Sequence, residues 1–183
     1  MRDRSFIRRS LLCAGVLIGC GLSAAATATA QTFDQVALDG MVPQMSSTLL
    51  ASRLKQNNSI LVFDVREREE FLVSRLPGAM HAGPSTAPDQ FLRRVASRTS
   101  GATFVFYCAA GARSAELSQA VYHDLMERGA AGVYILKDGI IDWHNEGRGL
   151  IDATGPVKFV HPFNDELKGR MKHPELARNS PGQ

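Results

Sequence analysis

Short apolar runs alternate along the chain with segments whose apolar residues recur every three or four positions. Continuous runs are typical of strands buried on both faces of a parallel sheet. The clear runs predict strands at residues 60–63, 103–107 and 133–136, and a brief strand is expected at 79–81. The periodic segments predict helices at residues 48–56, 67–72, 89–98, 114–128 and 140–145. This alternation indicates one α/β domain with a mainly parallel sheet flanked by helices.

Polar residues mark where several of these helices begin or end. Ser46 or Ser47 can cap the first helix, and Asp89 is expected to cap the third. Gly129 is placed to end the fourth. The charged run 67–70 is interpreted as the solvated face of the second helix.

The chain divides into four segments. They are a signal peptide at 1–30, an irregular segment at 31–45, the α/β domain at 46–147 and a C-terminal extension at 148–183. Prolines interrupt the extension, within which residues 164–171 could form one helical stretch. The extension is too short to be a domain, so it is expected to pack on the domain or to stay loose.

The first 30 residues have the three parts of a secretory signal. Residues 2–9 carry four arginines, residues 11–18 are apolar, and the small residues 24–30 end in Ala-Thr-Ala. The apolar run is too short to span a bilayer. The sequence therefore predicts export, to the periplasm or otherwise out of the cytoplasm.

Two features leave the type of signal open. Arg8-Arg9 resembles a twin-arginine signal, although Ile7 stands where a polar residue is usual, so ordinary secretion stays possible. Cys20 ends a lipobox-like run and would then be lipidated, which is the one route by which we expect membrane attachment. Cleavage after Ala30 is favoured because it fits the small-residue rule.

The charge of the chain is concentrated in this leader. The chain has 21 Lys and Arg residues against 18 Asp and Glu residues. Four of the basic and one of the acidic residues lie in the first 30, so 17 of each sign remain after cleavage. A nearly neutral protein is a poor partner for nucleic acid, because phosphate contacts need clustered basic residues.

Cleavage after Ala30 would also leave Cys108 as the last of the three cysteines. One cysteine cannot form an intramolecular disulfide, and exported proteins usually carry cysteines in pairs. Cys108 is therefore either a buried hydrophobic residue or a reactive thiol.

The loop that starts at Cys108 favours reactivity. It lies between a strand and a helix N-terminus, where ligands of α/β sheets bind and where backbone amides favour a thiolate. Such a cysteine is expected to be partly exposed in an electropositive setting. Small residues let the loop curl its amides inward, glycine permits a positive φ, and arginine can bind an oxyanion. Serine can cap the helix or donate to the sulfur. The loop comprises Cys108, Ala109, Ala110, Gly111, Ala112, Arg113 and Ser114.

The motif C-x-x-G-x-R-S resembles the loop of a single-domain rhodanese. Asp64-Val65-Arg66, Pro77-Gly78-Ala79 and the Gly139 to Trp143 spacing follow the same family order, over about residues 46–147. The resemblance implies a sulfurtransferase that moves a sulfane sulfur from thiosulfate or a polysulfide to a thiophilic acceptor through a Cys108 persulfide. It implies that the amides from Ala109 to Ser114 cradle the sulfur, that Arg113 orients substrate, and that no cofactor or metal is needed.

The resemblance has limits that bear on substrate. Ser74-Arg75 and Asp138 replace residues usual in the family, and the loop has one basic side chain, which leaves the donor open. Phosphatases of this fold have C-x5-R, and the shorter C-x4-R here favours sulfur over phosphate. A persulfide carrier without turnover, or a redox-sensing binding module, remains the alternative. Small sulfur compounds are the expected substrates, and a thiol-bearing protein is a possible acceptor.

The remaining candidates have mainly structural interpretations. Asp64 and Arg66 are expected to form an ion-pair or capping network that supports the loop. His81 is expected to be a satisfied, partly buried residue, and Trp143 to lie in the core or in a pocket wall. Metal binding is not expected, because the histidines of the extension lack partners at ligand spacing. A basic cluster in the extension is expected to be solvated, with binding of an anionic partner as the alternative; it comprises Lys158, Lys168, Arg170 and Lys172.

Overall fold

The computed structural model describes residues 42–56 and 59–181. The predicted signal peptide lies outside these residues, with Cys13, Cys20 and the cleavage site after Ala30. Most of the segment 31–45 lies outside them too. Within the described ranges, no helix has the length and hydrophobicity that crossing a bilayer requires.

The described chain contains a five-stranded sheet whose pairings are all parallel, as the alternating pattern predicts. The strands, in spatial order, are β1 (Gln44–Met45), β5 (Gly132–Leu136), β4 (Thr103–Tyr107), β2 (Ile60–Asp64) and β3 (Met80–His81). Asp64 on β2 pairs with Tyr107 on β4, so the residues that follow these strands share one edge of the sheet.

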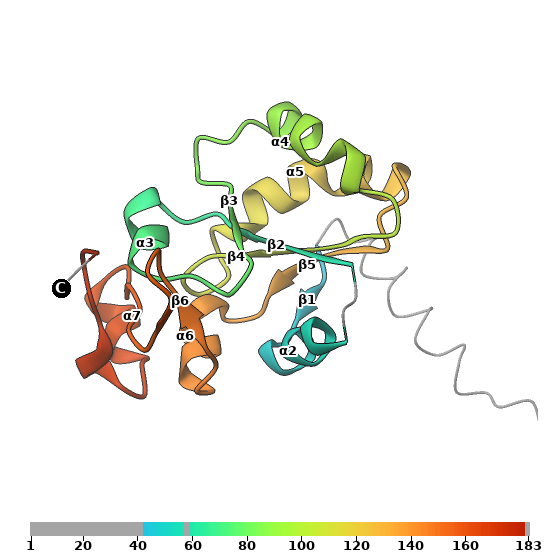
Figure 1. The fold of residues 1–183 in the computed structure, drawn as a ribbon. Coiled ribbons are helices and arrows are strands. Elements are labelled where there is room, and N and C mark those ends of the chain that lie inside the picture. The colour runs from blue at the N-terminus through green and yellow to red at the C-terminus, as the bar shows by residue number, and fades with distance from the viewer. Residues whose placement is uncertain (1–41, 57–58, 182–183) are drawn as a thin grey trace, which may run out of the picture.

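Helices cover both faces of the sheet (Figure 1). Helices α4 (Pro88–Val95) and α5 (Ser114–Glu127) lie on one face, and α2 (Ser47–Lys55) and α6 (Gly139–Asn145) on the other. The short helix α3 (Arg68–Val73) stands at the edge where the strands end. The layers match the predicted α/β architecture.

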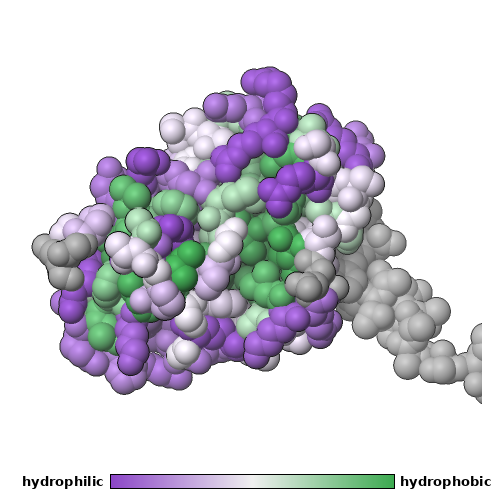
Figure 2. All heavy atoms as spheres, viewed as in Figure 1, coloured by the Kyte–Doolittle hydropathy of each residue, from purple (hydrophilic) through white to green (hydrophobic). Residues whose placement is uncertain are grey.

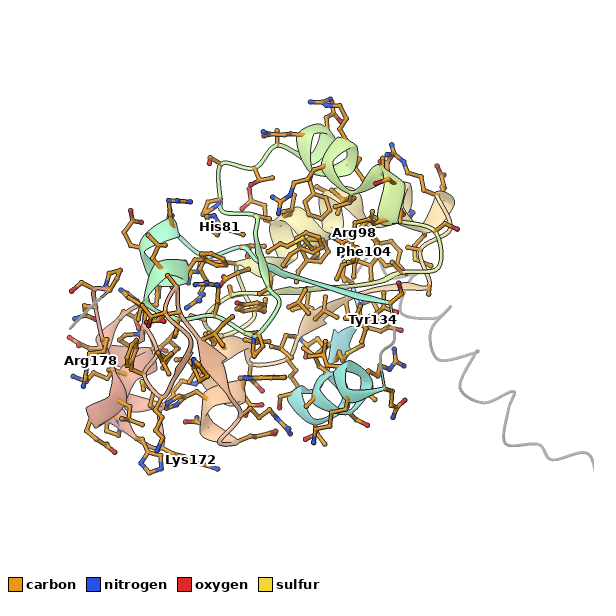
Figure 3. All side chains as sticks on the ribbon, in the orientation of Figure 1. His81, Arg98, Phe104, Tyr134, Lys172 and Arg178 are labelled. Atoms are coloured by element: carbon orange, nitrogen blue, oxygen red, sulfur yellow. The ribbon has the colours of Figure 1, made fainter. Side chains whose placement is uncertain are left out.

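Each face of the sheet has its own hydrophobic core. Four phenylalanines, three from the sheet and Phe91 from α4, pack in the core on the α4 and α5 side, with the rings of Phe63 and Phe91 4.8 Å apart. Burial of each such ring contributes roughly 1.5–3 kcal/mol. Figure 3 shows Phe104 on this side and Tyr134 on the α2 side. In Figure 2 the apolar residues on the visible face gather between purple rims over α4 and α2.

The structure corrects two predicted boundaries. Asp89 does not cap α4, because Ala87 occupies the N-cap and Pro88 the first turn, where its fixed φ suits a helix start. The helix ends at Val95 and is followed by the 3-10 turn η1 (Ala96–Arg98). The segment 31–45 is not irregular to its end, since β1 pairs with β5. A two-residue strand is too short to show a period in the sequence.

The C-terminal extension packs on the domain. Strands β6 (Leu150–Ile151) and β7 (Pro156–Val157) form an antiparallel pair, followed by α7 (Asp165–Gly169) and the turn η2 (Pro174–Leu176). The helical stretch predicted at 164–171 is thus shorter than expected. Val160, Leu167 and Met171 are buried. Figure 1 shows this red segment beside α3 and α6, at the edge where the strands end.

Candidate active site

Cys108 follows β4 at that edge and begins the loop that leads into α5. The Gly111 N–H donates to its Sγ at 3.1 Å. Gly111 has φ 95°, a left-handed conformation that glycine adopts without strain. Cys108 is 1% exposed, so it is more buried than the sequence led us to expect. Ala109 is buried beside it, whereas Ala112 is exposed.

The first turn of α6 holds the start of this loop. The Ile140 N–H donates to the Cys108 carbonyl at 2.9 Å, and the Ile141 N–H donates to the Ala109 carbonyl at 3.1 Å. In a trans peptide the C=O and the following N–H point in opposite directions. The N–H groups of Ala109 and Ala110 therefore point away from α6. Because the carbonyls face α6, the opposite side of the loop presents N–H donors, an arrangement that suits an anion.

Gly139 permits this close approach of α6. It has φ 60°, and a Cβ added there would overlap the carbonyl oxygens of Cys108 and Ala109. The loop and the start of α6 thus pack backbone to backbone, and this contact restricts movement of the loop.

Ser114 closes the other end of the loop. Its buried Oγ donates to the Gly111 carbonyl at 2.6 Å and lies 4.0 Å from Cys108 Sγ. A hydroxyl has one proton, and the shorter contact takes it. Ser114 is the first residue of α5 rather than its N-cap, a position that Arg113 occupies without a side-chain cap. Of the two roles that the sequence allows for Ser114, capping α5 is therefore wrong.

Arg113 is paired with a carboxylate that the sequence analysis placed in solvent. Its Nη1 and Nη2 donate to the two carboxylate oxygens of Glu70 at 2.7 and 2.9 Å. The Glu70 side chain is 4% exposed and that of Arg113 is 29% exposed. Glu70 also accepts from the Glu67 N–H in a capping box at the start of α3. The prediction of a solvated face at 67–70 is therefore wrong for Glu70.

The ion pair sets the charge of both partners. Burial raises the pKa of Glu70, but the hydrogen bond and charge of Arg113 outweigh it and hold the pKa below its ordinary 4.5. Burial lowers the pKa of Arg113, and the hydrogen bond and charge of Glu70, with the charge of Cys108, raise it overall. The side chains around the thiol are thus balanced in charge, and the backbone amides remain as its donors.

Asp64 and Arg66 form the expected ion pair, fully buried, with Arg66 Nη2 2.6 Å from Asp64 Oδ2. Arg66 Nη2 also donates to the Ser74 carbonyl at 2.7 Å. Tyr107 Oη donates to Asp64 Oδ2 at 2.7 Å, and burial, then the Asp64 charge, raises the pKa of Tyr107 well above 10. The Leu76 N–H donates to that Oη at 3.2 Å. The pair therefore fixes the residue that precedes Cys108.

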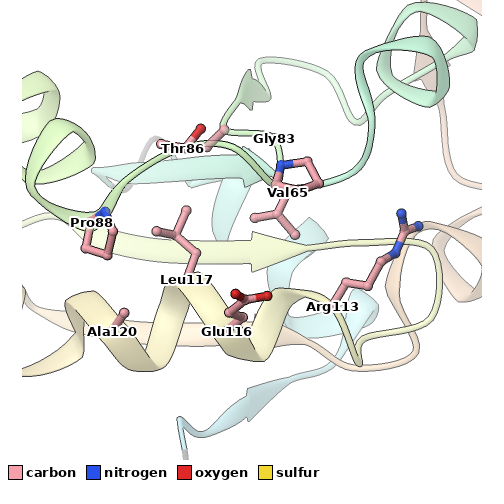
Figure 4. A pocket seen from close by; sticks show the side chains of 10 residues that line it. Val65, Gly83, Thr86, Pro88, Arg113, Glu116, Leu117 and Ala120 are labelled. Carbon is pink, nitrogen blue, oxygen red and sulfur yellow. The ribbon is translucent and has the colours of Figure 1, made fainter.

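A pocket of about 200 Å³ lies between the first turns of α5 and the segment that follows β3 (Figure 4). Its apolar lining includes Val65, Ala82 and Leu117, which belong to the same buried cluster as Cys108. Figure 4 shows Arg113 at the end of α5 nearest the loop. Arg113 is the residue of the Cys108 loop that lines this pocket, so a small molecule bound there contacts the loop at its arginine.

The other predicted residues have partners away from the thiol. His81 Nε2 bonds to the Arg66 carbonyl at 2.8 Å, and Trp143 is buried with Nε1 donating to the Gly149 carbonyl. Lys158, Lys168, Arg170 and Lys172 are exposed as expected, and Figure 3 shows Lys172 at the outer edge. Among the described residues, no group of three or more His, Cys, Asp and Glu could hold a metal ion.

Sequence reasoning missed two side chains at the site. Glu70 carries a signal in hindsight, because a glutamate three residues after an N-cap is half of a capping box. The sequence gives no such signal for Phe163. Its ring centroid lies 4.1 Å from Cζ of Arg113, although the two residues are fifty positions apart along the chain.

Comparisons with known proteins agree on one family. A model of the rhodanese-like domain matches residues 46–146. A sulfurtransferase of Allochromatium vinosum is 30% identical over 115 residues, which span 63% of this chain and 100% of that protein.

Two solved structures show the same fold. The BH2092 protein of Bacillus halodurans superposes with a TM-score of 0.53 at 18% identity, over 78% of this chain and 98% of that one. A thiosulfate sulfurtransferase of Pseudomonas aeruginosa gives 0.50 at 16% identity, over 70% of this chain and 23% of its own.

Proposed function

Because the chain belongs to the rhodanese-like domain family, we propose that it is a sulfurtransferase whose Cys108 carries the sulfur as a persulfide. The observation that carries this proposal is the hydrogen bond from the Gly111 N–H to Cys108 Sγ. It lies in a loop whose first two carbonyls accept hydrogen bonds from α6. Amides placed in this way stabilise both a thiolate and an anionic persulfide.

The proposed reaction consists of two displacements at sulfur. The Cys108 thiolate attacks the outer sulfur of a donor, the donor's sulfur–sulfur bond breaks, and the remainder leaves with the bonding electrons. A thiophilic acceptor then attacks the outer sulfur of the persulfide, and Cys108 leaves as a thiolate. The enzyme alternates between a free and a loaded form, which gives ping-pong kinetics.

The donor and acceptor we propose are small. Thiosulfate, which would release sulfite, and polysulfide both present a sulfane sulfur to the thiolate. The pocket of about 200 Å³ supports small substrates, and the 1% exposure of Cys108 disfavours a large one. A protein thiol could accept the sulfur only if it reached the loop on a narrow segment.

Intact mass spectrometry after incubation with thiosulfate tests the proposal. We expect Cys108 to gain about 32 Da, and we expect cyanide to remove it with turnover, because the thiolate is the nucleophile. Cys108→Ser abolishes both, while the exposed Arg128→Gln serves as a matched control. Absence of the mass gain from thiosulfate and from polysulfide would overturn the proposal. If Cys108 gains sulfur but no small acceptor removes it with turnover, the protein is a persulfide carrier rather than an enzyme.

We also propose that the protein is exported, on the strength of the leader described above. The measurement is the mass of the mature N-terminus in the native host. A chain that begins at Gln31 supports secretion, a lipidated Cys20 assigns a membrane anchor instead, and an uncleaved chain in the cytoplasm contradicts export.

A further inference from the structure

The C-terminal extension, which begins where the family match ends, brings an aromatic ring to the candidate active site. The Phe163 ring lies over the guanidinium of Arg113, with 4.1 Å between its centroid and Cζ. That distance is within the range of a cation–π contact. Arg113 in turn is the cation whose pKa responds to the charge of Cys108. Through this contact the extension is linked to the loop 108–114, which we call the thiol loop.

Phe163 is held in place by the backbone around it. Its φ is 73°, a left-handed conformation that is rare and costly for a bulky residue. Its N–H donates to His161 Nδ1 at 3.0 Å, and Pro162 between them is buried. Buried Val160 anchors the turn by backbone hydrogen bonds to Leu176 and Arg178. The extension therefore imposes this conformation on Phe163.

Core packing does not account for the strain. Phe163 is 47% exposed, one of three large hydrophobic residues that stand out on the described surface. Exposure of an aromatic ring forgoes much of the free energy that its burial would contribute. A strained backbone at an exposed aromatic residue points to a role at the site it touches.

The contacts of Arg113 show what that role is. Glu70 binds the guanidinium edge through two hydrogen bonds, while the Phe163 ring covers its face. The Glu70 end of the pair is buried, whereas Arg113 keeps 29% of its side chain exposed. The ion pair is thus oriented with its positive end toward entering molecules.

We propose that Phe163 is a positioning residue that fixes Arg113 so that anionic sulfur compounds are preferred at Cys108. The preference for sulfur compounds rests on the proposed function, whereas the preference for anions does not. In this arrangement the extension is part of the site and sets which donors react fastest. His161 does not add a second positive charge at neutral pH, because burial lowers its pKa and the nearby arginines lower it further, against a rise from Glu70.

A matched pair of alkylating reagents tests the preference without any sulfur transfer. Iodoacetate and iodoacetamide react with a thiolate by the same displacement of iodide, but only iodoacetate is an anion. The ratio of their rates at Cys108, followed by peptide mass spectrometry, measures the local preference for anions. Phe163→Ala should lower this ratio about two- to fivefold, which corresponds to the free energy of an exposed cation–π contact.

Three variants separate positioning from a structural effect. Phe163→Leu keeps an apolar side chain without a π face and should lower the ratio as Phe163→Ala does. Phe163→Trp should restore it, because indole is the strongest cation–π partner. Leu49→Ala removes an equally exposed apolar residue on α2 and should leave the ratio unchanged. An unchanged ratio in Phe163→Ala, or full retention in Phe163→Leu, overturns the proposal.

Thiosulfate kinetics provide the second measurement. For Phe163→Ala, KM for thiosulfate should rise by the same factor as the alkylation ratio falls, with kcat nearly constant, because Arg113 acts on entry of the anion. An equal loss in kcat would contradict a positioning role. A shifted alkylation ratio in a protein without sulfur transfer would refute the proposed function and leave the role of Phe163 standing.

Discussion

The ion pair between Glu70 and Arg113 joins α3 to the thiol loop, and its contribution can be measured by a double-mutant cycle. Glu70→Gln keeps an oxygen for the capping hydrogen bond from Glu67, and Arg113→Met keeps an apolar stem of similar length. The loss of the Phe163 contact occurs in both variants that lack Arg113, so it cancels from the coupling energy.

The expected coupling lies between two limits. Breaking a fully buried pair costs about 3–5 kcal/mol, whereas an exposed pair contributes less than about 1 kcal/mol. Here one partner is 4% exposed, the other 29%, and two hydrogen bonds join them. Partial screening by solvent at Arg113 reduces the upper figure, and we expect a coupling of about 2 kcal/mol.

Urea denaturation, followed by Trp143 fluorescence, gives the four free energies of unfolding. The pair Arg128 and Asp124 is an internal control, since both side chains are more than 40% exposed, with Asp124 in the last turn of α5 and Arg128 at its C-cap. Its coupling should be about 0.3–0.5 kcal/mol. If the Glu70 cycle gives no more than this control at unchanged m-values, the ion pair does not brace the loop.

Two further predictions concern pH and backbone packing. Glu70 has a lowered pKa in the folded protein, so its stabilisation is present above pH 4.5 and is lost as the pH falls through the folded value. The difference in Tm between wild type and Glu70→Gln should be constant at neutral pH and should shrink as the pH falls below 4.5. A difference that stays constant down to pH 3 contradicts this. Gly139→Ala forces a Cβ onto two carbonyl oxygens and strains a positive φ. Thermal denaturation should show that the free energy of unfolding falls by more than about 2 kcal/mol, whereas the matched control Gly149→Ala, which meets no neighbouring atom, should leave it nearly unchanged.

The sequence was sufficient where local pattern decides the structure. The run Thr103–Tyr107 is β4, with the predicted ends, and Ser46 caps α2 as one of the two expected candidates. The loop after β4 was located by its small residues and glycine. In each case the neighbours that determine the conformation are adjacent in the chain.

Apart from the two helix caps at Asp89 and Ser114, the misses have a different cause, because the partners of the missed residues are distant in sequence. Glu70 is buried by an arginine 43 positions away, and a polar helix face gives no sign of that. β1 has two residues and gains its strand character from β5. Phe163 lies in a proline-broken segment without periodicity, so tertiary packing alone places it on Arg113. Long-range contacts of this kind define the site but leave no local pattern.

The hold of α6 on the thiol loop also sets an order of events during synthesis. The carbonyls of Cys108 and Ala109 are satisfied by amides of Ile140 and Ile141, which leave the ribosome only after α5 and β5. A nascent chain that ends before α6 has the thiol but lacks the donors that orient its loop. The loop therefore reaches its final geometry late, when α6, the last helix of the α/β domain, docks.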